Sequence, residues 1–173
     1  MPVGTIIVLA FLAFVAVTIF KGVRIVPQGY KWIVQRLGKY HSTLNPGLNF
    51  VIPYIDDVAY KVTTKDIVLD IPSQEVITRD NAVLLMNAVA YINLTTPEKA
   101  VYGIENYTWA IQNLVQTSLR SIVGEMDLDD ALSSRDHIKA KLKAAISDDI
   151  SDWGITLKTV EIQDIQPSST MQA

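Results

Sequence analysis

The sequence predicts an α+β protein that begins with a transmembrane helix, and three observations support this. An uncharged apolar run occupies the first 20 residues, short β-rich segments extend from residue 23 to residue 94, and helical patterns follow to about residue 153. One further strand, residues 155–165, ends the pattern. Strands first, then helices, then a closing strand indicate α+β rather than an alternating, doubly wound sheet.

The apolar run from Pro2 to Phe20 contains 19 uncharged residues. As a helix it would reach about 28 Å, close to the thickness of a hydrocarbon core. No basic residue precedes the run and no clear cleavage site follows it, so an anchor is favoured over a cleaved signal peptide. We assign residues 1–21 to this anchor. Its expected transmembrane side chains are Val3, Ile7, Leu9, Phe11, Phe14, Val17 and Phe20.

Charge is distributed unevenly along the chain. Residues 1–55 contain five Lys and Arg and no acidic residue, whereas the other ten of the 15 basic residues accompany all 18 acidic ones, a balance of −8. Because positive charge beside a span stays on the inner side, we expect a single-pass membrane protein with its domain in the cytoplasm and its short N-terminus outside. The expected membrane-surface cations are Lys21, Arg24, Lys31, Arg36 and Lys39.

The segment after the anchor suggests a hairpin, because β-rich residues 23–26 and 30–37 flank the turn Pro27-Gln28-Gly29. Residues 44–55 follow as an uncharged apolar stretch with two prolines, too short to span a membrane. The stretch is either a buried strand between turns or an apolar loop that dips into the headgroup region. In the second case the inserting side chains are Leu48, Phe50, Val51, Ile52 and Ile55.

The central part of the chain predicts meandering strands over residues 58–62, 67–71 and 75–78, broken at Pro72-Ser73. Residues 82–94 give the strongest strand pattern. Its even positions, expected to face the core, are Leu84, Met86, Ala88, Ala90, Ile92 and Leu94.

Helices are predicted from Pro97 to about Ile104, from Tyr107 to Val123, and over a single region from Leu128 to about Trp153. Thr96 and Asp127 are expected to cap the first and third, and Gly124 to end the second in a left-handed conformation. Leu132, Ile138, Leu142, Ala145, Ile146 and Ile150 are expected to face inward. In the last strand the apolar parity changes, which predicts a bulge near Lys158-Thr159.

No catalytic constellation emerges from the residues. Imidazole comes only from His41 and His137, and in Ser134-Arg135-Asp136-His137 adjacent helical residues point in different directions. Asp127-Leu128-Asp129-Asp130 lacks the glycine and the final Glu of a calcium loop. Without cysteine, a phosphate loop or a nucleic-acid motif, the chain is expected to be a non-enzyme with no cofactor, no metal and no nucleic-acid partner.

Motifs distributed along the chain resemble the stomatin, prohibitin and flotillin superfamily, also called the SPFH or band 7 family. They include Ile25-Val26-Pro27-Gln28-Gly29-Tyr30, Arg36-Leu37-Gly38-Lys39-Tyr40, Pro46-Gly47-Leu48, residues 69–78, Leu119-Arg120-Ser121-Ile122-Val123-Gly124, Asp152-Trp153-Gly154-Ile155 and Val160-Glu161-Ile162-Gln163-Asp164-Ile165. The resemblance covers nearly everything after the anchor and is greatest to a bacterial stomatin-like or QmcA-like member.

The resemblance implies a domain of mainly antiparallel strands with helices packed on one side. This domain would divide into a membrane-proximal subdomain, residues 22–66, and a second subdomain, residues 67–166. Residues 167–173 would begin a helical region that is not present here. It further implies a scaffold that forms large homo-oligomeric rings or cages, binds membrane lipids and marks microdomains. An NfeD-type protein or a membrane AAA protease is an implied partner, and regulation of such a protease in protein quality control is the alternative function.

Overall fold

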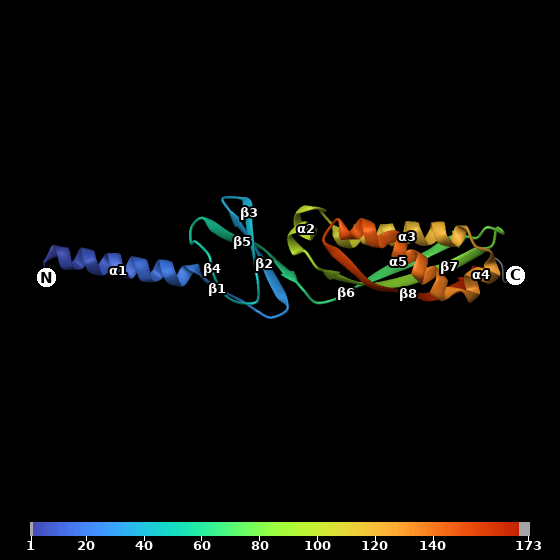
Figure 1. Ribbon diagram of the computed structural model, residues 1–173, viewed down its shortest axis with the longest axis horizontal. Coiled ribbons are helices and arrows are strands. Elements are labelled where there is room, and N and C mark those ends of the chain that lie inside the picture. Colours follow the sequence, from blue (N-terminus) through green and yellow to red (C-terminus); the bar gives the residue numbers. More distant parts are fainter. Residues whose placement is uncertain (1, 170–173) are drawn as a thin grey trace. The chain divides into compact units, whose positions relative to one another are not determined.

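The computed structural model describes residues 2–169, which form two compact units, one ending at Thr64 and the other beginning at Lys65 (Figure 1). The predicted start of a helical region over residues 167–173 therefore lies largely outside the described part. The first unit contains α1 (Val3–Gly22), β1 (Val23–Val26), β2 (Tyr30–Arg36), β3 (Lys39–Leu44), β4 (Gly47–Phe50) and β5 (Asp56–Thr63). The second contains β6 (Ile67–Ile77), β7 (Val83–Leu94), α2 (Pro97–Tyr102), α3 (Tyr107–Gly124), α4 (Leu128–Ser133), α5 (Arg135–Ser151) and β8 (Ile155–Pro167).

Two small antiparallel sheets follow α1 in the first unit: β1 pairs with β4, and β2 lies between β3 and β5. The predicted hairpin of residues 23–26 with 30–37 is therefore wrong. Leu37 and Gly38 both have positive φ, at 51° and 82°, and they close a tight turn between β2 and β3. Because β3 and β5 occupy both edges of β2, β1 must find its partner elsewhere.

A small hydrophobic core holds the first unit together. Val26, Val34 and Leu44 are buried against one another, and Trp32, Val51 and Val58 pack on them half-buried. Since Val26 comes from the β1–β4 ribbon and Val34 from the three-stranded sheet, this cluster fastens the two sheets together.

The second unit is an antiparallel sheet in the order β6-β7-β8 with helices on one side, so the α+β prediction is confirmed (Figure 1). Helix α3 packs on β6, α5 packs on β8, and the two helices contact each other. All six even positions predicted to face the core on the central strand are buried: Leu84, Met86, Ala88, Ala90, Ile92 and Leu94.

The edge strands of this sheet carry irregularities. The predicted break at Pro72-Ser73 is wrong, because β6 runs on as one strand with a register shift between Ile71 and Gln74. Proline is tolerated there because β6 is an edge strand, where the missing N–H need not join a ladder. On β8, Tyr91 pairs with Thr159 and Ile92 with Leu157, so Lys158 is skipped and the predicted bulge is confirmed.

Several helix predictions need correction, among them the cap at Thr96, whose side chain makes no capping hydrogen bond. The region from residue 128 to 153 is two helices, because Ser134 leaves the helical conformation at φ −115° and ψ 47°. The break shifts the helical phase, so Leu132 is exposed, and Ala145 lies on the outer face of α5. Gly124 is the last residue of α3 and does not adopt a left-handed conformation.

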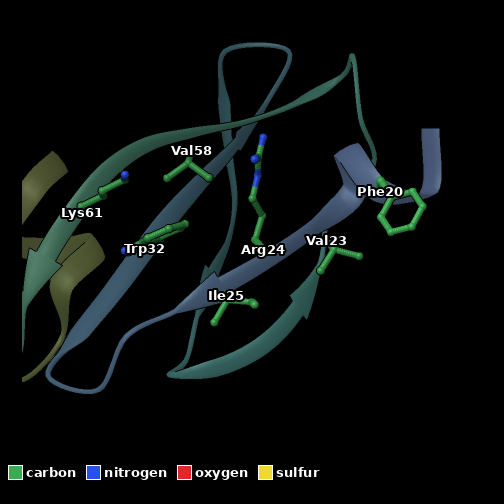
Figure 2. Close-up of a pocket in the computed structure, with 7 residues that line it drawn as sticks. All are labelled: Phe20, Val23, Arg24, Ile25, Trp32, Val58 and Lys61. Atoms are coloured by element: carbon green, nitrogen blue, oxygen red, sulfur yellow. The ribbon is translucent and has the colours of Figure 1, made fainter. Parts of the chain in front are cut away.

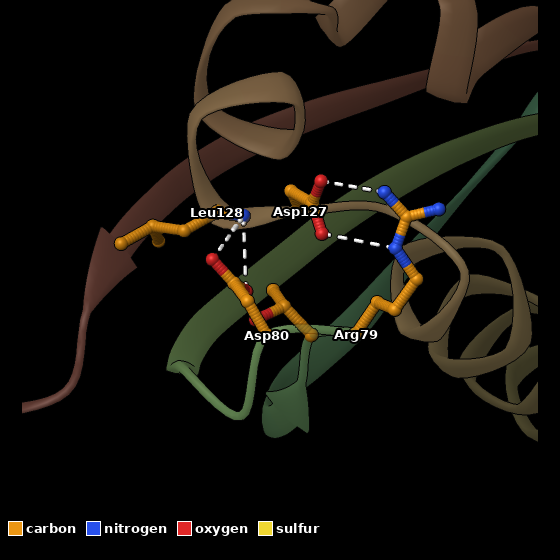
Figure 3. Close-up of polar contacts among 5 residues, drawn as sticks. Arg79, Asp80, Asp127 and Leu128 are labelled. Carbon is orange, nitrogen blue, oxygen red and sulfur yellow. Dashed lines mark hydrogen bonds and ion pairs between the residues drawn. The ribbon is translucent and has the colours of Figure 1, made fainter.

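The turn between β6 and β7 is fastened to the start of α4 (Figure 3). The Arg79 guanidinium donates to both Asp127 carboxylate oxygens, at 3.0 and 2.5 Å. The backbone N–H of Leu128 donates to the Asp80 carboxylate at 3.2 and 3.3 Å. Asp127 occupies the cap position but makes no capping hydrogen bond, so Asp80, 48 residues earlier in the chain, satisfies the helix start instead.

Replacing Leu142 by Ala tests the core of the second unit. Leu142 is fully buried, so the truncation leaves a cavity and should lower the free energy of unfolding by about 2–5 kcal/mol. Leu132→Ala is the matched control, since that side chain is 38% exposed and should change stability by less than about 1 kcal/mol. Denaturant unfolding of the two variants measures the difference. Equal losses would contradict the assigned packing.

Candidate membrane interface of the first unit

Helix α1 is long and apolar enough to cross a membrane, and none of its most apolar stretch is buried within the protein. The seven side chains predicted to span, from Val3 to Phe20, all lie exposed on it. The hydroxyl of Thr18, near the C-terminal end of the helix, donates a hydrogen bond to the carbonyl oxygen of Phe14 at 2.8 Å. A helix that satisfies its own polar groups in this way is compatible with hydrocarbon.

The end of α1 is joined directly to the loop of residues 51–55. The backbone N–H of Val51 donates to the carbonyl oxygen of Gly22 at 2.8 Å. Gly22 is buried, and a Cβ atom there would lie 2.7 Å from the Val51 carbonyl oxygen. The close approach of the two backbones therefore depends on glycine at residue 22.

The β1–β4 ribbon carries apolar side chains on its outer face. Val23 pairs with Phe50 and Ile25 with Leu48, and residues paired in this way share one face of an antiparallel ladder. Val26, of opposite parity, points into the core. We call Val23, Ile25, Leu48 and Phe50 the apolar ribbon face; Val23 is half-buried and the other three are exposed, Phe50 by 71%.

The 51–55 loop extends this apolar surface. Ile52, Tyr54 and Ile55 are exposed, and the Lys21 ammonium lies 5.5 Å from the centroid of the Tyr54 ring. Val51 differs from the other residues predicted to insert, because it packs half-buried against the core of the unit. Insertion of Leu48, Phe50, Ile52 and Ile55 into lipid stays a prediction.

The five expected membrane-surface cations have different environments. Lys21, Arg24 and Lys39 are exposed and Lys31 is half-buried. The Arg36 guanidinium, in contrast, binds the Asp56 carboxylate through two hydrogen bonds of 2.7 and 3.0 Å.

The Arg36–Asp56 pair is an ordered structural contact. Hydrogen bonding from Arg36, helped by the backbone N–H of Ile52 at 2.9 Å, lowers the pKa of the Asp56 carboxyl from 3.8 to about 2. Asp56 is the first acidic residue of the chain, one position beyond the basic segment, so the sequence does not reveal that it neutralises Arg36.

A cavity of about 540 Å³ lies where α1 meets the sheets (Figure 2). Trp32 on β2 and Lys61 on β5 contribute to it, and the Lys61 ammonium lies 4.4 Å from the centroid of the Trp32 ring. Sequence reasoning missed both residues, although tryptophan close to a span is a known signal of the membrane–water boundary. The complete lining is Phe20, Val23, Arg24, Ile25, Trp32, Val58 and Lys61.

The two histidines of the chain offer no catalytic group within either unit. His41 and His137 are both exposed and belong to different units. Within residues 2–169, no group of three or more His, Cys, Asp or Glu is placed to hold a metal ion. The candidate site is therefore a surface and a cavity around the end of α1.

Residues 24–173 match the model of the SPFH domain / Band 7 family. The match begins two residues beyond the end of α1 and covers the rest of the first unit and the whole second unit.

Individual relatives are similar over most of the chain. An uncharacterized protein of Mycobacterium tuberculosis is 36% identical over 98% of this chain and 46% of its own length. An uncharacterized protein of Methanocaldococcus jannaschii is 42% identical over 86% of this chain and 74% of its own. Human stomatin-like protein 2, mitochondrial, is 39% identical over 81% of this chain and 39% of its own. The chain thus spans about half the length of the mycobacterial relatives that it matches.

Replacing Gly22 by Ala tests the junction between α1 and the 51–55 loop. The added methyl would meet the Val51 carbonyl oxygen, so we expect the loop to separate from the helix and stability to fall by about 1–3 kcal/mol. Gly4→Ala, on the same helix with nothing within 4 Å, is the control and should be neutral or slightly stabilising. Thermal unfolding in detergent, together with amide exchange at Val51, measures both effects. Unchanged exchange in the Gly22 variant would contradict the assigned contact.

The Arg36–Asp56 pair predicts a specific pH dependence. The pKa of Asp56 is depressed in the folded state. The stabilising effect of this carboxylate is therefore fully present above pH 3.8 and is lost as the pH falls toward about 2. The difference in melting temperature between the wild type and Asp56→Asn should therefore be constant at neutral pH and shrink below about pH 4. Asp57→Asn, which removes an exposed neighbour, controls for net charge. A difference that persists unchanged at pH 2 would contradict the assignment.

Proposed function

The chain belongs to the SPFH domain / Band 7 family, and on that premise we propose that it is a membrane-anchored scaffold that self-assembles at the bilayer. Through this assembly it would organise membrane microdomains and partner proteins. The observation that carries the proposal is the junction at Gly22 and Val51, which joins a candidate span to a second exposed apolar segment.

Two attachments to the bilayer follow from that junction. Helix α1 supplies one, and the exposed residues of the apolar ribbon face and of the 51–55 loop supply the other. Apolar surface of this kind gains about 25 cal/mol for each Å² removed from water, so its transfer into the headgroup and acyl boundary is favourable. Exposed cations beside it, Lys21 and Arg24, would add attraction to anionic lipid.

Double attachment explains how a weak contact between copies could build an ordered array. A domain on a single flexible tether rotates freely and must lose that freedom whenever it joins a neighbour. A domain held at two points has already lost part of this freedom, so less entropy opposes lateral association.

The side of the membrane follows from charge in this proposal. The basic residues lie C-terminal to α1, and positive charge near a span favours the cytoplasmic side. We therefore place the two units in the cytoplasm, at the inner membrane of a bacterium, with the N-terminus outside. Binding to an NfeD-type protein, or regulation of a membrane AAA protease as the alternative role, is proposed from the family resemblance.

Replacing Phe50 and Ile52 by Asp tests attachment and assembly together. Both side chains are exposed, by 71% and 47%, so the full-length double variant should fold while its ribbon is expelled from lipid. We expect α1 to keep the variant in vesicles, while the number of copies per cluster falls toward one. Photobleaching step counts in vesicles measure cluster size, and thermal unfolding in detergent reports folding.

Two comparators interpret that experiment. Phe50→Leu with Ile52→Leu keeps the surface apolar and should keep the clusters. Val34→Asp places an unpaired carboxylate in the core and should abolish the folding transition. If the Phe50 and Ile52 double Asp variant also loses its transition, the two residues belong to the core. If it folds and still forms full clusters, ribbon insertion is not needed for assembly.

A further inference from the structure

Helix α5 of the second unit carries positive charge in its first half and negative charge in its second half. Residues 135–143 contain four Lys and Arg and one Asp, whereas residues 144–151 contain two Asp and no basic residue, and the C-cap is Asp152. This order opposes the helix macrodipole, which favours acidic residues at the start of a helix and cations at its end. The stability of the isolated helix therefore gives no reason for this charge order.

Three of the four cations of α5 are used within the chain. Arg135, Lys139 and Lys143 reach the edge strand β8, where they bind two backbone carbonyl oxygens and one carboxylate. Lys141 differs from them, because it is exposed and forms no ion pair within residues 2–169. On the acidic half, the exposed carboxylate of Asp148 is likewise outside the three ion pairs of the described chain.

Lys141 and Asp148 cannot neutralise each other within one helix. They lie seven positions apart on the same side of α5, which separates them by about 10.5 Å along the axis. No residue three or four positions from either one carries the opposite charge. Both charges are thus available to a partner outside the chain.

The surface of α5 between these two charges is low. Ala144 lies midway between them and is exposed, and Ala140 one turn earlier is exposed as well. The opposite side of the helix packs on the rest of the unit through Ile138, Leu142, Ile146 and Ile150. Small residues at the centre of a helix face allow a second helix to approach to about 8 Å between axes.

Both edges of the sheet in the second unit are partly occupied by helix side chains. On β6, the amides of Gln112 and Gln116 from α3 donate to the carbonyl oxygens of Asp70 and Pro72, at 2.8 and 3.5 Å. On β8, side chains of α5 bind two further carbonyl oxygens. Carbonyl groups engaged in this way are less available to an added strand. The outer face of α5 is therefore better suited than either strand edge to receive a second copy.

We propose that two copies of the chain associate by packing their α5 helices antiparallel, about a two-fold axis that passes beside Ala144. The antiparallel alignment places Lys141 of one copy opposite Asp148 of the other, and the two-fold symmetry forms this pair twice. It also brings the basic half of each helix over the acidic half of its neighbour and opposes the two macrodipoles. The inference rests on the proposed self-assembly and gives it a defined contact.

This contact is weak by design of its size. A helix pair that meets over two turns buries far less than the roughly 1,200 Å² at the lower end of standard stable interfaces. Such a contact would not hold two chains together in dilute solution. It becomes effective where copies are already oriented, as the proposed double attachment to the bilayer provides.

Charge reversal in the full chain, reconstituted in vesicles, tests the pairing. Lys141→Asp or Asp148→Lys places like charges opposite each other twice, so we expect the dissociation constant between copies to rise about tenfold. The double variant exchanges the two signs and should restore association. A mixture of the two single variants should form mixed pairs in preference to like pairs, because every facing charge is then opposite in sign. Two-colour photobleaching counts measure each population.

Asp148→Lys also separates association from folding. A cation near the end of α5 suits the macrodipole, so this variant should melt no lower than the wild type in detergent even though it associates less. Glu125→Lys makes the same charge change at the exposed C-cap of α3 and should leave association unchanged. Equal losses in these two variants would overturn the proposal, and so would failure of the double variant or of the mixture to associate.

Cross-linking tests the position of the axis. The chain contains no cysteine, so a single introduced thiol reports one position. Ala144→Cys in vesicles at low protein density should be joined into a dimer by a short bifunctional maleimide, whereas Ser121→Cys, exposed on α3, should stay monomeric. Equal yields from the two positions would contradict the assigned contact.

The wild-type sample distinguishes failure of this contact from failure of self-assembly. If the wild type forms clusters in vesicles but neither charge reversal alters them nor Ala144→Cys cross-links, only the α5 contact is wrong. If the wild type forms no clusters, the proposed self-assembly is wrong and the α5 contact is wrong with it.

Discussion

The way in which the chain leaves α1 determines the arrangement of the first unit. The last carbonyl groups of a helix lack partners within it and must find them elsewhere. Here the carbonyl oxygen of Gly22 accepts from Val51 across 29 positions of sequence, and this bond aligns β1 with β4. Once that register is set, Val26 must face the core, and Ile25, Leu48 and Phe50 must face outward.

Folding of the first unit does not explain why that outward face is apolar. A two-stranded ribbon is marginal by itself, and this one is held through Val26 on its inner face, so polar side chains outside would serve folding equally well. A contiguous exposed apolar surface usually marks an interaction site. Its continuity with helix α1, which is uncharged as far as Phe20, favours a lipid phase as the surroundings of both.

Local patterns were readable from the sequence, and pairings between distant segments were not. The alternation along β7 and the parity change at Lys158 lie within single strands, so periodicity revealed them. The β1–β4 pairing depends on the turn at Leu37-Gly38, which gives β2 a different partner from the one that chain order suggests. Asp80 and Arg79 at the start of α4 were likewise missed, since they act from 48 residues away.

At the candidate site, the exposed positions of Leu48 and Phe50 agree with the predicted surface, while Val51 packs inward because Gly22 holds its backbone.

Counting basic residues near a span overstates the positive charge available to lipid. Of the five cations in residues 1–55, Arg36 is neutralised by Asp56. Arg24 is exposed and lines the cavity with Lys61, a residue outside that segment that strand pairing brings beside Trp32. The positive charge near the end of α1 is thus set by the sheet as well as by the sequence next to the helix. Charge that a fold brings together from distant segments can act jointly on one partner, which a count of basic residues along the sequence does not reveal.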